Sequence, residues 1–208
     1  RDGQFDILLD RGVIADIRPS IPANGAKTID ARDLLVVPGL VDLHTHLREP
    51  GNEEEETISS GARAAVAGGV TSVACFPNTE PAIDNEAAAE FVVLQGKRAG
   101  FANVFPVGAV TLNREGKLLA EMGGLARAGA VAFSDADRSV ESAEMMRRGL
   151  LYAKMFNKVV ISHCEDPTLR GAGVMNQGLV AFRLGLSGIP SAAEEIVVAR
   201  EMTKLHEE

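Results

Sequence analysis

Hydrophobic and polar residues alternate along the start of the chain, and this pattern changes after residue 37. Residues 5–10 (FDILLD) and 13–19 (VIADIRP) each alternate, with Arg-Gly between them. Because every second side chain of a strand faces the same side, the pattern predicts a β-hairpin. Two strands are too few to be stable alone. We therefore expect residues 1–37 to pack on further strands as a small β layer.

From residue 38 onward, short apolar runs alternate with helical segments. The runs predict strands at residues 40–46, 70–77, 102–110, 130–135 and 158–166. The segments between them predict helices at residues 58–69, 85–100, 117–129 and 139–156, the last with Ser139 as N-cap. Strands separated by helices in this rhythm indicate βαβ units and a parallel sheet covered on both faces.

Polar side chains gather where these strands end, and this favours one α/β architecture over another. They are His44, His46, Arg48, Asn78, Asp135 and His163. Several strand ends contributing to one site is the layout of a TIM barrel. No Gly-x-Gly-x-x-Gly follows the first strand, which disfavours a doubly wound dinucleotide fold. We predict an α/β TIM barrel, with about five of its eight βα units in residues 38–208.

The histidine pair in VDLHTHLREPG is the main candidate for chemistry. His44 and His46 are two residues apart on a strand, so both rings face the same side, with Cα atoms roughly 6.6 Å apart. Neutral imidazoles at that separation can bind one zinc or similar ion, although two polar residues at a strand end would look the same. Asp42 shares their face, and either orients a ligand histidine or lies buried. His163, at the end of the fifth strand, is a third candidate ligand.

Arg48 and Asn78 suggest that the substrate is an anion. A guanidinium binds a carboxylate through two parallel hydrogen bonds, and an amide adds a neutral donor. Asn78 lies in the proline-flanked segment FPNTEP, where simple turn formation is an equally good explanation.

Composition excludes some classes of partner. The net charge of −8 argues against nucleic acid and anionic membranes, and no apolar run approaches the ~20 residues of a membrane span. Cys75 and Cys164 lack CxxC spacing, which suits buried thiols and a cytoplasmic location; we expect Cys164 to lie in the core and His206 on the surface.

Four segments resemble a known family. VPGLVDLHTHLREPG is similar to the metal-binding signature of the amidohydrolase superfamily, and GGVTSVACFPNTEP, AVAFSDADRSV and ISHCED resemble the following segments of bacterial class I dihydroorotases. The resemblance covers essentially the whole chain and fits the N-terminal half of such an enzyme. It implies a metal-dependent hydrolase barrel, with residues 1–37 as part of a small β-sandwich. It also implies interconversion of N-carbamoyl-L-aspartate and (S)-dihydroorotate in de novo pyrimidine (UMP) biosynthesis.

The resemblance implies roles for individual residues. His44 and His46 would bind one zinc ion and His163 a second, giving two per full-length subunit, and His46, Arg48 and Asn78 would hold the substrate. The aspartate that acts as general acid and base would lie in the other half of the protein. We therefore expect residues 1–208 alone to be inactive.

One departure from the family pattern concerns the metal. Class I enzymes have a ligating aspartate after the fourth strand, and the family spacing places Ala136 there. Alanine cannot bind a metal ion. Either Asp137, which we prefer, or Asp135 replaces it through a local bulge, or the bridging carboxylate is lost.

Two other functions stay open. One is a hydantoinase- or allantoinase-type cyclic amidohydrolase, whose substrates would give Arg48 no carboxylate partner. The other is a non-catalytic scaffold that binds aspartate carbamoyltransferase, which Ala136 favours. A homodimer or a complex with that enzyme would be the expected assembly for an active protein.

Overall fold

The computed structural model describes residues 3–205, and the chain divides into two compact units. The first is Arg1–Pro38 and the second is Gly39–Glu208. The two units are described separately below. His206, which we expected on the surface, lies outside the described residues.

The first unit is a β-hairpin. β1 (Asp6–Asp10) pairs antiparallel with β2 (Val13–Arg18), as the alternating pattern predicted. The turn between them has positive φ at Arg11 and Gly12, as tight hairpin turns require. Apolar side chains such as those of Leu9 and Val13 stay largely exposed. Two strands with an exposed apolar face fit the expectation that this layer packs on further strands; its identity as part of a β-sandwich stays a prediction.

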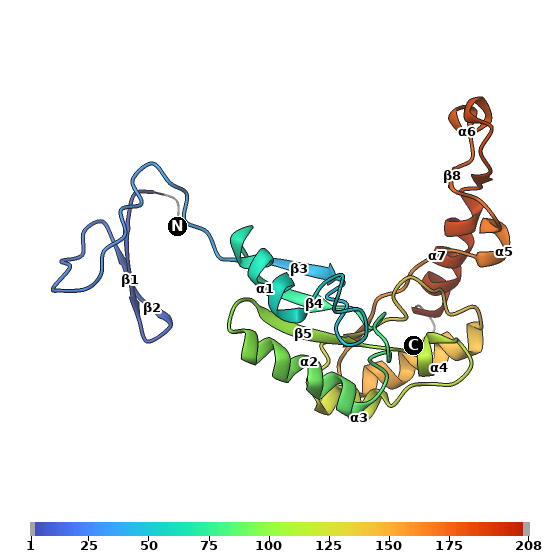
Figure 1. The fold of residues 1–208 in the computed structure, drawn as a ribbon, viewed down its shortest axis with the longest axis horizontal. Coiled ribbons are helices and arrows are strands. Elements are labelled where there is room, and N and C mark those ends of the chain that lie inside the picture. The colour runs from blue at the N-terminus through green and yellow to red at the C-terminus, as the bar shows by residue number, and fades with distance from the viewer. Residues whose placement is uncertain (1–2, 206–208) are drawn as a thin grey trace. The chain divides into compact units, whose positions relative to one another are not determined.

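The second unit is built on a parallel sheet of five strands (Figure 1). The strands are β3 (Leu40–Thr45), β4 (Val70–Cys75), β5 (Asn103–Gly108), β6 (Ala132–Phe133) and β7 (Val159–Val160). Their order in the sheet is β3-β4-β5-β6-β7, the same as their order in the chain. A doubly wound sheet reverses its strand order at a switch point, whereas a barrel adds each strand next to the previous one. The topology is therefore α/β and of the barrel type.

Helices connect and follow these strands. They are α1 (Ile58–Ala67), α2 (Glu86–Ala99), the 3₁₀ turn η1 (Leu112–Arg114), α3 (Met122–Arg127), α4 (Ala143–Met155), α5 (Pro167–Arg170), α6 (Leu179–Leu184) and α7 (Ala192–Leu205). A short parallel pair, β8 (Met175–Asn176) and β9 (Gly188–Ile189), flanks α6. The sequence pattern did not predict this pair or α6.

Two predicted helix starts are wrong. The segment at residues 117–129 is helical only from Met122, because the residues before it form a loop that pairs Thr111 with Leu119. The N-cap of α4 is Ser142, which accepts a hydrogen bond from the Met145 N–H at 3.2 Å, and not Ser139. The hydroxyl of Ser139 forms hydrogen bonds with the backbone after β7 instead.

The two faces of the sheet have different cores. On β4, Val73 and Cys75 pack into the large cluster shared with the helices, whereas Ala74 and the residue directly after the strand, Phe76, belong to a smaller cluster. The smaller cluster consists of Ala74, Phe76, Val107, Ala132 and Ala136, with Ile161 packed against it. A helix-covered face and an opposite face filled by a few side chains are what an arc of a barrel would have.

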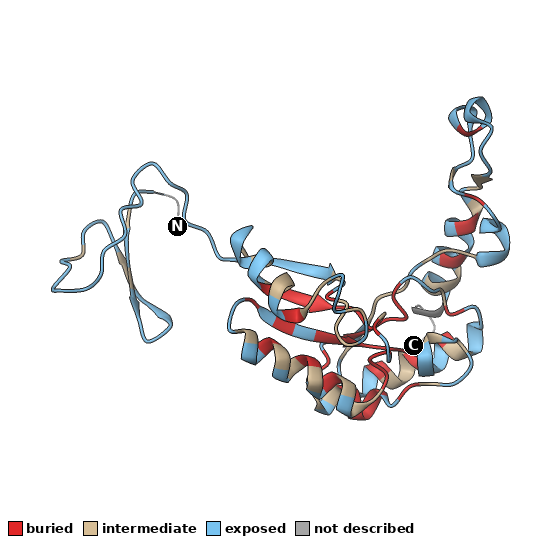
Figure 2. Cartoon of the chain, in the orientation of Figure 1, coloured by how far each residue is buried: buried red, intermediate tan, exposed pale blue. Residues whose placement is uncertain are grey.

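The edge strand β3 is mostly exposed, in contrast to β4 next to it (Figure 2). Leu40, Val41 and Leu43 are each more than half exposed. A strand edge without a partner, flanked by apolar side chains, favours association, so natural sheets cover or pair such edges. β3 therefore presents an edge at which a further strand could pair.

The two cysteines have different environments. Cys75 is fully buried, and burial raises the pKa of its thiol to about 12. Cys164 is only partly buried, so its predicted place in the core is wrong; its thiol lies 3.9 Å from the Ser162 carbonyl oxygen. None of the helices within residues 3–205 is long and apolar enough to cross a membrane.

Candidate functional site

The end of β3 places two imidazoles side by side. His44 lies in β3 and His46 directly after it, and their ring centroids are 4.9 Å apart in an edge-on arrangement. The ring of His44 stacks on Phe76, with centroids 3.9 Å apart and planes within 12°. Phe76 follows β4 and is buried, so it provides a fixed surface for the ring. The two rings therefore lie close together on one side, as the strand alternation predicts.

A hydrogen bond orients the second of these rings. Nδ1 of His46 lies 2.7 Å from Oδ1 of Asn78, which comes from the turn after β4. An amide oxygen can only accept, so Nδ1 is the donor in this contact, and in the neutral tautomer with this arrangement Nε2 keeps its lone pair. Outer partners of metal-binding histidines set the ring orientation and tautomer in this way. Asn78 is therefore in a position to orient His46.

The electrostatic surroundings favour the neutral form of His44. Its pKa is lowered from the ordinary value of 6.5, chiefly by partial burial and then by the positive charges that His46 and His163 can carry. Asp42 acts in the opposite direction. Its carboxylate accepts a hydrogen bond from the His44 main-chain N–H at 3.0 Å and is exposed, so it is neither buried nor bonded to the ring. A neutral imidazole is the form that binds metal.

Arg48 is close in sequence but has a different partner. Its Nε lies 3.2 Å from Oε2 of Glu55, and its side chain is about one-third exposed. Its backbone has φ of 60°, which is uncommon outside glycine. Exposed ion pairs of this kind contribute little stability. Arg48 could therefore exchange Glu55 for another anionic partner at low cost.

Asp135, at the end of β6, is a buried structural residue. Its Oδ1 accepts hydrogen bonds from the N–H groups of Val110 and Thr111 at 2.8 and 3.0 Å, and its Oδ2 accepts one from the Thr111 hydroxyl at 2.5 Å. Burial raises the pKa of this carboxyl, although these hydrogen bonds and the nearby Arg114 act in the opposite direction. The carboxylate ties the β6 tip to the loop after β5.

The next two residues have separate surroundings. Oδ1 of Asp137 accepts a hydrogen bond from Nη1 of Arg114 at 2.6 Å. Partial burial would raise the pKa of Asp137, but the hydrogen bond and charge of Arg114 outweigh it and lower the value. Ala136, between the two aspartates, has φ of 56° and is buried, with its side chain in the smaller apolar cluster that includes Phe76.

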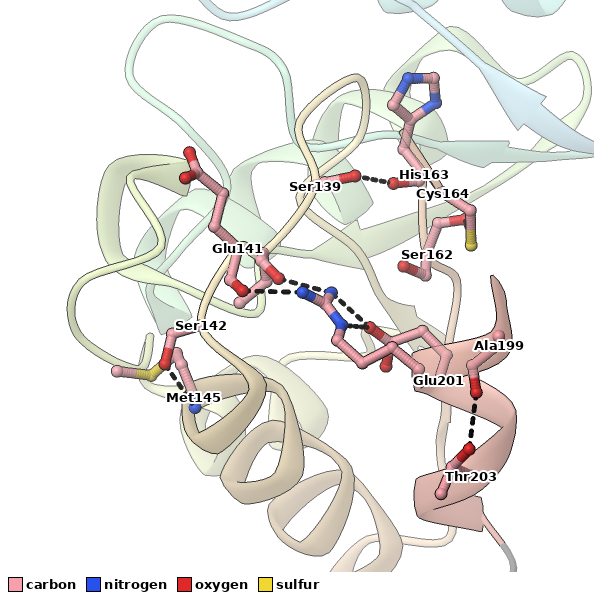
Figure 3. Close-up of polar contacts among 12 residues, drawn as sticks. Ser139, Glu141, Ser142, Met145, Ser162, His163, Cys164, Ala199, Glu201 and Thr203 are labelled. Atoms are coloured by element: carbon pink, nitrogen blue, oxygen red, sulfur yellow. Dashed lines mark hydrogen bonds and ion pairs between the residues drawn. The ribbon is translucent and has the colours of Figure 1, made fainter. Parts of the chain in front are cut away.

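His163 follows β7 and is held through its backbone (Figure 3). The Ser139 hydroxyl donates to the His163 carbonyl oxygen and accepts from the Glu165 N–H at 3.0 Å. The guanidinium of Arg200 in turn holds the segment after Ser139, by donating to the carbonyl oxygens of Val140 and Glu141 at 2.8 and 2.7 Å. The ring of His163 points away from the Cys164 sulfur, as strand alternation predicts.

A depression of about 460 Å³ opens beside His163. Its lining includes Asp137, Ser139 and Glu165 and several cationic side chains. Arg114, Ser139 and Arg200, which position this region, were not predicted as site residues. Nothing in their local sequence separates them from ordinary loop or helix residues, because their partners lie 21 to 60 residues away.

The predicted ligands are only partly gathered. Within residues 3–205, histidine, cysteine, aspartate and glutamate side chains form no group of three or more that could hold a metal ion. The His44–His46 pair supplies two ligands of the kind zinc prefers, so it fits part of a site for one ion. The surroundings of Asp135 and Asp137 do not fit a carboxylate-bridged pair of ions. The ligand roles of His44, His46, His163, Asp137 and Asp135 stay predictions.

The whole described chain has the fold of a known hydrolase structure. It superposes on L-hydantoinase (dihydropyrimidinase) from Arthrobacter aurescens with a TM-score of 0.74 and 23% sequence identity, covering 98% of this chain and 47% of that one. This likeness identifies the α/β fold class and no more.

The family follows from the sequence comparisons. A family model described as dihydro-orotase-like matches residues 33–205. The chain is 52% identical over 202 residues to a dihydroorotase from Pelobacter propionicus, and 50% identical over 202 residues to one from Geobacter metallireducens. Each alignment covers 97% of this chain and 48% of the relative, so the chain spans about half the length of the curated relatives it matches. The chain belongs to the dihydro-orotase-like family, which confirms the resemblance seen in its motifs.

Proposed function

We propose that the protein is a dihydroorotase, a zinc-dependent cyclic amide hydrolase that interconverts N-carbamoyl-L-aspartate and (S)-dihydroorotate in pyrimidine biosynthesis. The observation that carries this proposal is the oriented histidine pair at the end of β3, in a chain about 50% identical to dihydroorotases. A complete eight-stranded barrel, with the first unit as part of a β-sandwich, would be the scaffold.

His44 and His46 would hold the zinc ion in this scheme. Oδ1 of Asn78 accepts a hydrogen bond from Nδ1–H of His46 and leaves Nε2 free, and Phe76 keeps the His44 ring in place. When bound, zinc would polarise the amide carbonyl and supply a hydroxide at neutral pH, so no protein nucleophile would be required. Closing or opening the ring also needs a group that moves protons. Within residues 3–205 we identify none, and we expect the aspartate that does so to lie in the other half of the protein.

Arg48 would bind the substrate carboxylate. Arg48 comes two residues after His46 in the sequence, and its guanidinium pairs with Glu55. A carboxylate could form two parallel hydrogen bonds with it, which a single neutral donor cannot match. This residue separates the proposal from a hydantoinase- or allantoinase-type reaction, since those substrates have no carboxylate to bind.

The test is the activity of the full-length protein on (S)-dihydroorotate, measured by chromatography of the open and closed forms. Arg48→Ala should raise KM about 10- to 100-fold, because charge-assisted hydrogen bonds are lost. Arg63→Ala, at an exposed arginine of α1, is the matched control and should leave KM unchanged. Activity on hydantoin in place of dihydroorotate, insensitive to Arg48→Ala, would contradict the proposal.

A second function has one specific observation in its favour. Ala136 occupies the position where the family pattern has a metal-binding aspartate, which would suit a non-catalytic scaffold that binds aspartate carbamoyltransferase. Full-length protein that lacks activity on dihydroorotate, but forms a stable complex with that enzyme, would favour this alternative. For an active protein we propose a small-molecule substrate, a cytoplasmic location and either a homodimer or the same complex.

A further inference from the structure

The three residues Asp135, Ala136 and Asp137 at the end of β6 face three different environments. If a carboxylate from this strand is to reach the zinc ion, one of the two aspartates has to face the histidine pair of β3. The contacts of each residue decide whether that is feasible.

Asp135 is committed to the loop after β5. It is 4% exposed, and three donors, two main-chain N–H groups and the Thr111 hydroxyl, converge on its two oxygens. Turning this carboxylate toward a metal would leave the N–H groups of Val110 and Thr111 buried without acceptors. Each orphaned donor costs roughly 1–3 kcal/mol. Asp135 therefore stays where it is.

Asp137 faces a fixed positive charge. Its partner Arg114 has a side chain only 13% exposed, and Nη1 of Arg114 also donates to the Asp135 carbonyl oxygen at 3.4 Å. The Nε of Arg114 is buried and has no hydrogen-bond partner among the described residues. A metal ion bound to Asp137 would lie beside this guanidinium, and the two positive charges would repel each other. The position is thus unfavourable for a cation.

Ala136 is the residue of the three whose side chain lies in the small apolar cluster on the Phe76 side of the sheet. Its side chain belongs to the same small cluster as Phe76, and Phe76 stacks directly on His44. Of the three residues, the one that shares a cluster with the ring on which His44 stacks thus carries only a methyl group. Its φ of 56° is a conformation that aspartate adopts more readily than most residues, so a carboxylate would be tolerated there.

We propose that the metal centre holds a single zinc ion on the His44–His46 pair and receives no carboxylate from the end of β6. This inference rests on the proposed function for the presence of zinc, and it replaces the expectation of two ions per subunit. The sequence changes the site at one position, Ala136, and the neighbouring aspartates do not compensate.

The experiment is elemental analysis of the full-length protein, purified with zinc and dialysed. We expect one zinc per chain in the wild type and in Asp137→Ala. His44→Ala combined with His46→Ala should remove it. Ala136→Asp should raise the content to two, and circular dichroism should show that it is folded; the smaller change Ala136→Ser adds a polar group without a charge and should leave the content at one.

Each result bears on the inference. Two zinc ions in the wild type, no zinc in the wild type, loss of zinc in Asp137→Ala, or folded Ala136→Asp with one zinc would overturn it. Activity on dihydroorotate, measured on the same samples, separates this inference from the proposed function. An active wild type with two ions refutes the inference alone, whereas an inactive wild type with one ion refutes the function alone.

Discussion

The ends of β3 and β6 both carry polar residues that the sequence predicts as site residues, but the side chains at the two ends have different roles. At β3, His44 and His46 are largely exposed, although Phe76 covers one face of the His44 ring, and the ring of His46 has one hydrogen bond, to Asn78. At β6, Asp135 is buried and accepts three hydrogen bonds. The side chains at β3 keep lone pairs free for a ligand. The lone pairs of the Asp135 carboxylate instead accept the hydrogen bonds that hold the end of β6 to the loop after β5.

The difference shows that a strand-end position does not by itself make a residue functional. Both strands follow the same pattern of an apolar run ending in polar side chains. What separates them is how many hydrogen-bond partners the fold brings to each side chain. A carboxylate with all its acceptor sites filled stabilises the protein, whereas an imidazole with one free nitrogen can bind a metal.

The largest expected effect comes from removing the Asp135 carboxylate at the end of β6. Asp135→Ala should lower the free energy of unfolding by about 3 kcal/mol or more, because three buried donors lose their acceptor. Asp137→Ala should lower the free energy of unfolding by about 1 kcal/mol or less, because the Asp137 side chain is exposed. Denaturant unfolding of the full-length protein measures both. Equal costs for the two variants would show that Asp135 is not the residue that holds the loops.

An intermediate effect is expected at the β3 site. Asn78→Ala should weaken zinc binding about 10- to 100-fold, because the outer partner that orients His46 is removed. Asn78→Asp should recover most of the affinity, since a carboxylate also accepts the Nδ1 proton. Competition with a chelator gives the affinities. If Asn78→Ala binds zinc like the wild type, Asn78 does not orient the ring.

The smallest effect concerns the protonation of His44. In metal-free protein we expect its pKa to lie below 6.5, chiefly because of partial burial, with Phe76 stacked on the ring. Between the lowered folded value and 6.5 the unfolded chain holds the extra proton. The contribution of His44 to stability is thus complete above pH 6.5 and is lost as the pH falls through the folded value.

An NMR titration of the His44 ring checks this expectation. Phe76→Ala should move the midpoint upward toward 6.5, since the ring becomes more hydrated. A midpoint at or above 6.5 in the metal-free wild type would contradict it.

The sequence was sufficient for the order of the five strands of the main sheet and for the histidine pair. The five strands, their parallel arrangement and the convergence of His44 and His46 depend on local periodicity, which the chain carries within each segment. The N-cap of α4 could not be predicted from the sequence. Ser139 and Ser142 are both good N-cap residues, and the choice between them depended on the contact of Ser139 with the end of β7. A local pattern cannot contain such information.

What the amino-acid sequence determined by itself is the fold class and the family, because these depend on residue identity and spacing. The tertiary structure decided which neighbours each polar side chain has. Arg114 meets Asp137 across 23 residues, and Thr111 meets Asp135 across 24. These partners are far apart in the chain, and only the packing of adjacent strands brings them within hydrogen-bonding distance, so the sequence pattern alone could not assign Asp135 and Asp137 their roles.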